Sequence, residues 1–245
     1  MIIYLASHEL FLTKRIKNME HLIIDSEDFE DLLFQIEDSF QVKFDLEDIQ
    51  NNLSINEIIG VVVSKMNLKE GIECSNQITF FRLRDQISKK HKLDSSQIGL
   101  ETKLKEIFPY KDRRKKWNKT FEGTDFKVPN LRPPIGLYLP AILITIISFF
   151  FIFGKNWNYG LPIFLVSATI VYLCSRYGKA LPARSLRDLT KHIVKFDYRG
   201  TRNRVGTFNH NEIKQIIFGL FIDWLNKEDS QSLSFETKIN YLGRS

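Results

Sequence analysis

Two long uncharged stretches stand out in the pattern of apolar and polar positions along the chain. Between Arg132 and Lys155 there are 22 residues without a charge, and between Lys155 and Arg176 there are 20 more. The densest apolar parts run from Ile135 to Phe153 and from Tyr159 to Ser175. A helix of this length spans about 28 Å, close to the hydrocarbon thickness of a bilayer. The pattern therefore predicts two antiparallel transmembrane helices, because the link between them is too short to cross back.

The flanks of these stretches predict which side of the membrane they face. Residues 111–132 hold eight Lys and Arg against three acids, and residues 176–204 hold nine against two, whereas the connecting loop holds Lys155 alone. By the positive-inside rule both soluble parts, and both termini, are expected in the cytoplasm. Aromatic residues at the ends of the stretches are typical of interfacial anchors. They are Tyr138, Trp157, Tyr159, Tyr172 and Tyr177.

The interior of the two stretches indicates an anchor. Neither holds an ionisable residue of the kind expected of a transporter, a proton relay or an intramembrane protease. A buried helical hairpin in a soluble core is the alternative interpretation. It is disfavoured because no other part of the chain is large enough to wrap such a hairpin.

An acidic segment near the N-terminus has a helical pattern of its own. Residues 20–50 contain eleven acids and one base, Lys43. Apolar residues recur between Phe29 and Phe40 at helical spacing, and Ser26 is placed as an N-cap. A short helix is predicted around Leu46 to Ile49, followed by a longer one from Ser54 to Met66. The buried face of the longer helix is expected to comprise Ile55, Ile58, Ile59, Val62 and Val63.

The stretch from Asp25 to Phe40 resembles the second helix of the acyl carrier protein family. It reads DSEDFEDLLFQIEDSF, so that it opens with Asp-Ser and ends with an acidic pair near a phenylalanine. The segment that follows, VKFDLEDIQNNLSINEIIGVVVSKM, is similar to the third and fourth helices of that family. The resemblance covers residues from about 22 to 67.

This resemblance implies a cofactor and a docking surface. In carrier proteins of this family a serine bears a 4′-phosphopantetheine arm, whose thiol carries the acyl group. Carried over, Ser26 is the attachment point and Asp25 its neighbour in the cofactor-binding motif. The acidic second helix of the family docks on basic surfaces of partner enzymes. The matching residues here are Glu30, Asp31, Glu37 and Asp38.

The sequence also departs from the family pattern. Glu27 stands where the family usually has leucine, and Ile23-Ile24 replaces a Leu-Gly pair. Only 25 residues precede Ser26, which is short for a first helix and its long loop. An unmodified N-cap serine and a merely solvated acidic face are the alternative interpretations.

Two later segments echo one another. Residues 97–104 read QIGLETKL and residues 232–239 read SLSFETKI, and each follows an expected amphipathic helix, at about 78–91 and 211–226. This layout is similar to a carrier first helix with its loop, and Ser185 to Val194 is similar to a carrier fourth helix. A permuted carrier fold, whose first helix comes from elsewhere in the chain, is one interpretation. Two amphipathic helices that are alike by chance are the other.

A basic stretch from Lys111 to Lys119 precedes the first uncharged run. Its position favours binding to anionic lipid headgroups at the membrane surface over nucleic acid, and a contact with the acidic segment is the alternative. The residues expected at the membrane surface are Arg113, Arg114, Lys115, Lys116 and Trp117.

Composition and missing motifs limit the chemistry. Cys74 and Cys174 are far apart and form neither a disulfide framework nor a metal-binding spacing, so no metal is expected. The sequence contains no Gly-rich phosphate loop, no His-Glu-x-x-His and no Gly-x-Ser-x-Gly motif. The five histidines are scattered, without a paired nucleophile. We therefore expect a protein that is not an enzyme; a site assembled from dispersed residues is the alternative.

These patterns combine into one expected architecture. The fold class is mainly α, with small helical cytoplasmic units and a two-helix transmembrane hairpin. The expected segments are an acidic carrier-like part, a helical part with a basic juxtamembrane region, the hairpin, and a basic, then helical C-terminal part. They cover residues 1–70, 71–134, 135–177 and 178–245. The expected function is that of a membrane-anchored acyl-carrier-like protein, with an unmodified interaction or scaffold module as the alternative.

Overall fold

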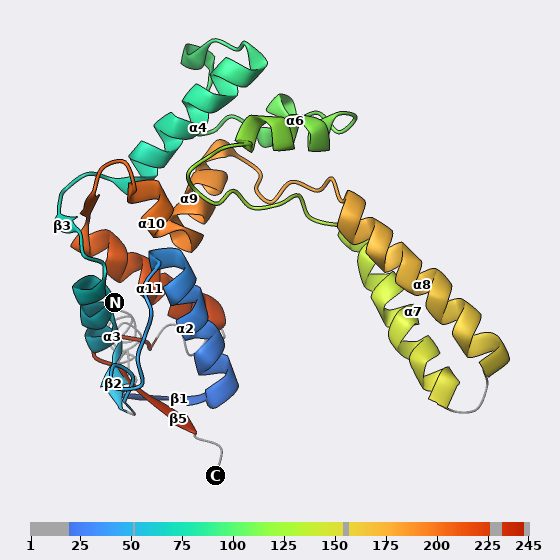
Figure 1. Cartoon of the computed structure of the whole chain (residues 1–245), viewed down its shortest axis with the longest axis horizontal. Coiled ribbons are helices and arrows are strands. Elements are labelled where there is room, and N and C mark those ends of the chain that lie inside the picture. Colours follow the sequence, from blue (N-terminus) through green and yellow to red (C-terminus); the bar gives the residue numbers. More distant parts are fainter. Residues whose placement is uncertain (1–19, 51, 154–156, 226–231, 243–245) are drawn as a thin grey trace, which may run out of the picture. The chain divides into compact units, whose positions relative to one another are not determined.

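The computed structural model describes residues 20–50, 52–153, 157–225 and 232–242. Within these residues the fold is mainly helical with a few short strands, which confirms the expected class. The chain forms two compact units. One, the outer unit, combines residues up to Ser75 with residues from Val194 onward; the other, the inserted unit, comprises Asn76–Ile193 (Figure 1). The four segments expected from the sequence are thus combined into two units, and the first and last parts of the described chain fold together.

The outer unit is built from both ends of the described chain. Its N-terminal elements are β1 (His21–Asp25), α2 (Ser26–Phe40), β2 (Leu53–Ser54), α3 (Ile55–Lys65) and β3 (Lys69–Glu70). Its C-terminal elements are α10 (Tyr198–Arg202), β4 (Thr207–Phe208), α11 (His210–Trp224) and β5 (Lys238–Leu242).

A small sheet joins these two sets of elements. Its strand order is β1-β5-β2, with β5 parallel to β1 and antiparallel to β2. His21 is paired with Lys238 and Asp25 with Leu242, so residues more than two hundred positions apart are neighbours. Strands β3 and β4 form a second, two-stranded parallel pair.

The core of the outer unit lies between α2, α3 and α11. Each helix contributes one apolar face, because its apolar residues recur every three or four positions. Fully buried members include Leu32 and Ile36 from α2, Ile58 from α3, and Ile213 and Ile217 from α11. The predicted face of α3 is confirmed, since Ile55, Ile58, Ile59 and Val62 are buried and Val63 packs against the same cluster. The helix that completes this core therefore comes from the C-terminal segment.

Two local predictions in this unit need correction. The N-cap of α2 is Asp25, whose carboxylate accepts a hydrogen bond from the backbone N–H of Glu27 at 3.0 Å, so Ser26 is the first residue of the helix itself. The helix expected from Leu46 to Ile49 is a turn instead, in which the Asp48 carboxylate accepts a hydrogen bond from the backbone N–H of Asp45.

The inserted unit holds the remaining elements and has a core of its own. They are α4 (Ser75–His91), a 3₁₀ turn η1 (Ser95–Gln97), α5 (Leu104–Ile107), α6 (Arg113–Phe121), α7 (Ile135–Phe153), α8 (Trp157–Tyr177) and α9 (Leu186–Phe196). The first residue of α4 and the last three residues of α9 belong to the outer unit. Buried residues of α4, α5, α6 and α9 form one apolar cluster. It includes Leu83, Ile87, Leu104, Phe108, Trp117 and Leu189.

The echoed segments occupy equivalent positions in the two units. In the outer unit, β5 follows α11 along the chain and lies antiparallel to β2. Strand β2 leads directly into α3, which begins with a capping box between Ser54 and Glu57. In the inserted unit, the echoed stretch follows α4, and Lys103 forms an antiparallel bridge with Ser185. Helix α9 then begins after Ser185, whose hydroxyl accepts from the backbone N–H of Asp188. Both units thus share one order of helix, bridging stretch and capped helix.

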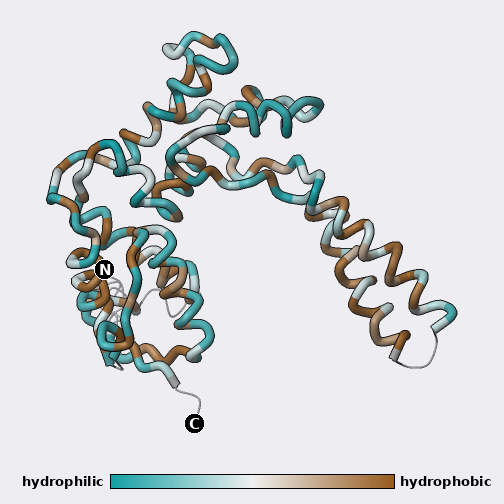
Figure 2. The backbone as a smooth tube through the Cα atoms, viewed as in Figure 1, coloured by the Kyte–Doolittle hydropathy of each residue, from teal (hydrophilic) through white to brown (hydrophobic). Residues whose placement is uncertain are grey.

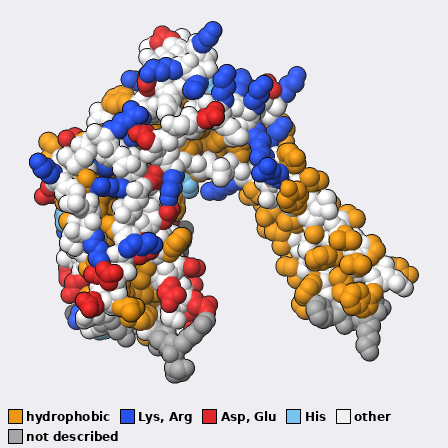
Figure 3. Space-filling model, in the orientation of Figure 1, with side chains coloured by type: hydrophobic (Ala, Val, Ile, Leu, Met, Phe, Trp, Pro, Cys, Tyr) orange, Lys and Arg blue, Asp and Glu red, His pale blue; other side chains and the backbone are white. Residues whose placement is uncertain are grey.

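Helices α7 and α8 are long and apolar enough to cross a membrane, by length and composition, and little of either is buried. The bounds of α7 are those predicted from the sequence, and α8 is longer by two residues at each end. Hydrophobic residues predominate along both helices (Figure 2), and hydrophobic side chains cover much of the face drawn in Figure 3. The hydroxyls of Thr145, Ser148 and Ser167 donate to carbonyls of their own helix, so these polar groups are satisfied without a partner outside the helix.

Candidate functional site

Ser26 lies in the first turn of α2, at one end of a surface groove. Because Asp25 occupies the N-cap, the Ser26 hydroxyl is not used to cap the helix, and within the described residues it forms no hydrogen bond. The residue is half-buried. The first turn of a helix also presents backbone N–H groups and the positive end of the helix dipole, which favour a negatively charged group there.

The groove beside Ser26, which we call the serine groove, has a volume of about 820 Å³. One wall is α2, the other is the segment from Phe44 to Ile49, and Tyr241 of β5 also lines it. The ring of Tyr241 stacks on Phe29 with 5.3 Å between centroids. Apolar side chains form much of the lining, namely Phe29, Leu33, Phe34, Phe44, Leu46, Ile49 and Tyr241. This volume lies within the range of small-molecule sites in proteins.

Two sets of polar contacts hold the far wall of the serine groove in place. Lys65 of α3 forms ion pairs with Asp45 at 2.7 Å and Asp48 at 2.6 Å. The hydrogen bond from Lys65 lowers the pKa of the Asp48 carboxyl, and the bonds to Asp45 and Asp48 raise the pKa of Lys65. On α2, the Glu37 carboxylate accepts from the backbone N–H of Phe44 at 2.8 Å. The wall is therefore fastened to both helices beside it.

The acidic residues expected to dock a partner separate into two groups. Glu30, Asp31 and Asp38 are exposed on α2 and form an acidic face, of which Glu30 and Asp31 also line the groove. Glu37 is instead held by the backbone of Phe44 and by Lys43 at 2.6 Å, which gives it a structural role. Two large apolar side chains lie exposed next to this face: Phe34 is 63% and Leu46 is 98% exposed.

Sequence analysis found the serine and the acidic face but missed the apolar walls of the groove. Tyr241 comes from β5, and its distance along the chain gives no local pattern that links it to Ser26. Phe44 and Leu46 lie in a segment whose short run was predicted to be a helix. The available signal in the sequence was that this run comes directly after an amphipathic helix, against which its apolar residues could pack.

The basic residues of α6 also differ in their positions. Arg113 donates from Nε to the carbonyl of Phe108 and from Nη1 to the carbonyl of Lys179, both at 2.8 Å, so it joins two backbone segments. Trp117 departs from the prediction of a membrane-surface residue, because it is only 3% exposed and packs between Phe108 and Phe121. Arg114 and Lys116 are half-buried, and Lys115 is exposed.

A histidine lies behind this basic helix. His91, at the end of α4, has its Nε2 at 2.8 Å from the hydroxyl of Thr120. That hydroxyl donates its proton to the carbonyl of Lys116, so Nε2 of the neutral ring donates to Thr120. Burial, together with the nearby charges of Lys116 and Lys119, lowers the pKa of His91.

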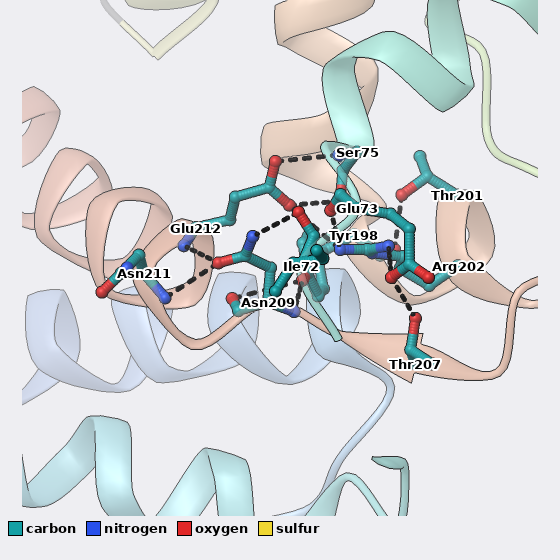
Figure 4. A network of polar contacts seen from close by, with 10 residues as sticks. All are labelled: Ile72, Glu73, Ser75, Tyr198, Thr201, Arg202, Thr207, Asn209, Asn211 and Glu212. Carbon is teal, nitrogen blue, oxygen red and sulfur yellow. Dashed lines mark hydrogen bonds and ion pairs between the residues drawn. The ribbon is translucent and has the colours of Figure 1, made fainter. Parts of the chain in front are cut away.

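A second polar cluster, not expected from the sequence, surrounds Arg202 of α10 (Figure 4). Its guanidinium is fully buried, with Nη2 at 2.5 Å from the carbonyl oxygen of Glu73 and 3.4 Å from the Glu212 carboxylate. The Ser75 hydroxyl donates to the same carboxylate at 2.5 Å. The cluster fastens the segment that leads into α4 to α10 and α11. Among the described residues no group of three or more His, Cys, Asp or Glu is placed to hold a metal ion.

Comparisons of the whole chain with protein-family models, with curated proteins and with solved structures find no match.

Proposed function

We propose that this chain is a membrane-anchored acyl-carrier-like protein in which Ser26 bears a 4′-phosphopantetheine arm. The observation that carries the proposal is the position of Ser26, whose hydroxyl forms no hydrogen bond among the described residues and lies in a groove lined by apolar and acidic side chains. A phosphodiester formed on Ser26 would gain from the positive end of the α2 dipole. The serine groove then provides an apolar surface along which a thioester-linked chain can lie.

The composition of the outer unit supports this proposal. The shared core of α2, α3 and α11 brings a helix from the C-terminal segment against the carrier-like helices α2 and α3, as a permuted carrier fold requires. The exposed acids Glu30, Asp31 and Asp38 offer a surface complementary to basic partner enzymes. In this proposal the chain presents a substrate, and the partner enzymes perform the catalysis.

The hairpin of α7 and α8 supplies the anchor. The excess of Lys and Arg on both flanks supports, by the positive-inside rule, a two-pass protein whose two soluble units lie in the cytoplasm. Such an anchor would keep acyl intermediates close to the membrane surface, where partner enzymes that act on lipids meet their substrates.

Intact mass spectrometry tests the modification. The full chain, co-expressed with a phosphopantetheinyl transferase and purified from membranes, should gain the mass of one arm. The gain should vanish in Ser26→Ala and persist in Ser64→Ala, since Ser64 is exposed on α3 and its hydroxyl bonds only to its own helix. An unmodified wild-type chain, or a gain that survives in Ser26→Ala, refutes the assignment.

An unmodified interaction module is the second candidate, and the exposed apolar pair Phe34 and Leu46 beside the acidic face favours it. A surface of this kind can bind a partner without any arm. In that case partner capture should survive Ser26→Ala and fail after the double reversal E30K/D31K. The matched control is E106K/E122K, which reverses two exposed acids of the inserted unit and should leave capture unchanged.

A further inference from the structure

The first turns of α2 and α6 match when the two helices are aligned on their buried residues. Phe29 and Leu32 of α2 are 4% and 1% exposed, and Trp117 and Thr120 of α6 are 3% and 1% exposed, at the same spacing of three. Each helix packs in the core of its own unit with the helix before its echoed stretch and the capped helix that follows it. The alignment therefore compares the same element in two similar units.

At this alignment the charges of the two helices are opposite. Arg114 stands at the position of Ser26, so α6 cannot carry an arm there. The acids Glu27, Asp28 and Asp31 of α2 correspond to Lys115, Lys116 and Lys119 of α6. The acidic face of α2, which is proposed to dock on basic partner proteins, thus corresponds in the inserted unit to a basic face of α6 that attracts anions.

Four cations around the start of α6 converge on one surface hollow, which we call the basic hollow. Its volume is about 370 Å³, and it is lined by Lys111, Asp112, Arg114, Lys115, Asn118 and Lys179. Within the described residues none of its Lys and Arg side chains forms an ion pair with a carboxylate. Asp112 is the single acid in the lining, so the hollow has a surplus of three positive charges that an anion would neutralise.

Three contacts connect the basic hollow to the end of the second apolar helix. Arg114 lies over the ring of Tyr177, the last residue of α8, at 5.7 Å from its centroid. The Arg113 guanidinium binds the carbonyl of Lys179 at 2.8 Å, and Lys179 Nζ lies 5.2 Å from the centroid of Tyr110. On the face drawn in Figure 3, Lys and Arg side chains gather above the apolar surface of the hairpin. Tyrosine at the end of a spanning helix marks the depth of the lipid headgroups.

We infer that the basic hollow binds the phosphate of an anionic phospholipid headgroup, and that α6 is a carrier-like helix converted into a lipid-binding one. Guanidinium and ammonium groups are the usual partners of phosphate oxygens, and an exposed aromatic ring beside them suits the interface. This inference rests on the membrane anchoring in the proposed function and does not depend on the modification of Ser26.

Lipid binding by the full chain, purified in an uncharged detergent, tests the inference. The chain is titrated with short-chain phosphatidylglycerol or phosphatidylcholine, and bound lipid is counted by native mass spectrometry. We expect phosphatidylglycerol to bind more tightly than phosphatidylcholine, and K111Q/K115Q to weaken its binding by roughly thirtyfold, given about 1 kcal/mol for each basic residue near an anionic surface. The charge-preserving variant K111R/K115R should restore binding.

Two control experiments distinguish lipid binding in the basic hollow from other sources of lipid affinity. K103Q/K105Q removes the same charge from exposed positions of the same unit and should leave binding unchanged; an equal loss there shows a diffuse effect of net charge and refutes the inference. Inorganic phosphate in excess should not displace the lipid, and displacement would assign the hollow to free phosphate instead. Equal binding of phosphatidylcholine also refutes the inference. A chain that needs no detergent to remain monodisperse would instead refute the anchoring on which it rests.

Discussion

The buried guanidinium of Arg202 is the most demanding single group in the outer unit. The guanidinium is fully buried, and its contacts with the Glu212 and Glu73 carboxylates are long, at 3.4 and 3.7 Å. Its Nε and Nη1 have no hydrogen-bond partner among the described residues. A buried charge is costly unless it is paired and hydrogen-bonded, so its short bond to the carbonyl of Glu73 carries much of the compensation. The result is a firm attachment of the segment that leaves the outer unit.

Replacing Arg202 with Met should therefore loosen that segment. The change leaves Glu212 paired only with Ser75 and removes the donor to the Glu73 carbonyl, and we expect a loss of about 3 kcal/mol in the stability of the outer unit. Hydrogen exchange of the backbone at residues 72–75 measures it. Lys69→Met, an exposed change in the neighbouring β3, should leave that exchange unaltered, and an unaltered rate in Arg202→Met would contradict the assigned role.

His91 gives the inserted unit a dependence on pH. Its pKa in the folded chain lies below the ordinary value of 6.5, chiefly because of burial, so the unfolded chain takes up the proton first as pH falls. Stability is therefore fully present above 6.5 and decreases as pH falls from 6.5 toward the lowered value. His91→Gln should reduce this decrease, as measured by hydrogen exchange of α4 and α6 at a series of pH values. The control His21→Gln, in the other unit, should leave the decrease in stability unchanged. If the full decrease persists in His91→Gln, His91 is excluded as its cause.

At the scale of elements, the segment from Phe44 to Ile49 owes its position to its neighbours, because it is a turn with no ladder of its own. Lys65 joins it to α3 through Asp45 and Asp48, and Glu37 joins it to α2. Because this segment is one wall of the serine groove, these contacts also set the width of the groove.

Lys65→Gln should release this wall. Both ion pairs are lost, and we expect hydrogen exchange at residues 44–49 to accelerate by roughly a few-fold, since partly exposed pairs contribute modestly. Lys43→Gln is the matched control, because Lys43 pairs with Glu37 on the opposite side and is largely exposed. Equal exchange in the two variants would mean that the ion pairs of Lys65 do not hold the wall in place.

The elements also show how far the sequence could be interpreted. The bounds of α7 follow from the length of one uncharged apolar run, and the buried face of α3 follows from its local periodicity, so a single segment is enough to predict each of them. The pairing of β1 with β5 could not be predicted in this way, because five-residue strands at opposite ends of the chain become partners only through the core they share. The run from Leu46 to Ile49 was misassigned because four residues with apolar ends and two acids between them fit a turn as well as a helix.

At the scale of the whole molecule, two similar helical units bear helices of opposite charge, and a single apolar hairpin interrupts one of them. The echoed Glu-Thr-Lys stretches indicated the similarity from sequence, but the interruption of one unit by another hid which helix completed which core. The candidate site could be predicted only in part from the sequence. Ser26 and its neighbouring acids lie on one helix and form a local pattern, whereas the groove needs residues from three segments of the chain.

The account depends on the hairpin crossing the bilayer, and labelling by a membrane-impermeant thiol reagent tests this most directly. Native Cys74 is exposed in the outer unit, so a Cys174→Ser chain reports on that unit, and Asn158→Cys added to a chain without other cysteines reports on the start of α8. In intact cells we expect labelling at position 158 and none at Cys74 until the membrane is opened. Labelling of both positions from the same side would contradict a two-pass anchor and the proposed cytoplasmic placement of the outer unit.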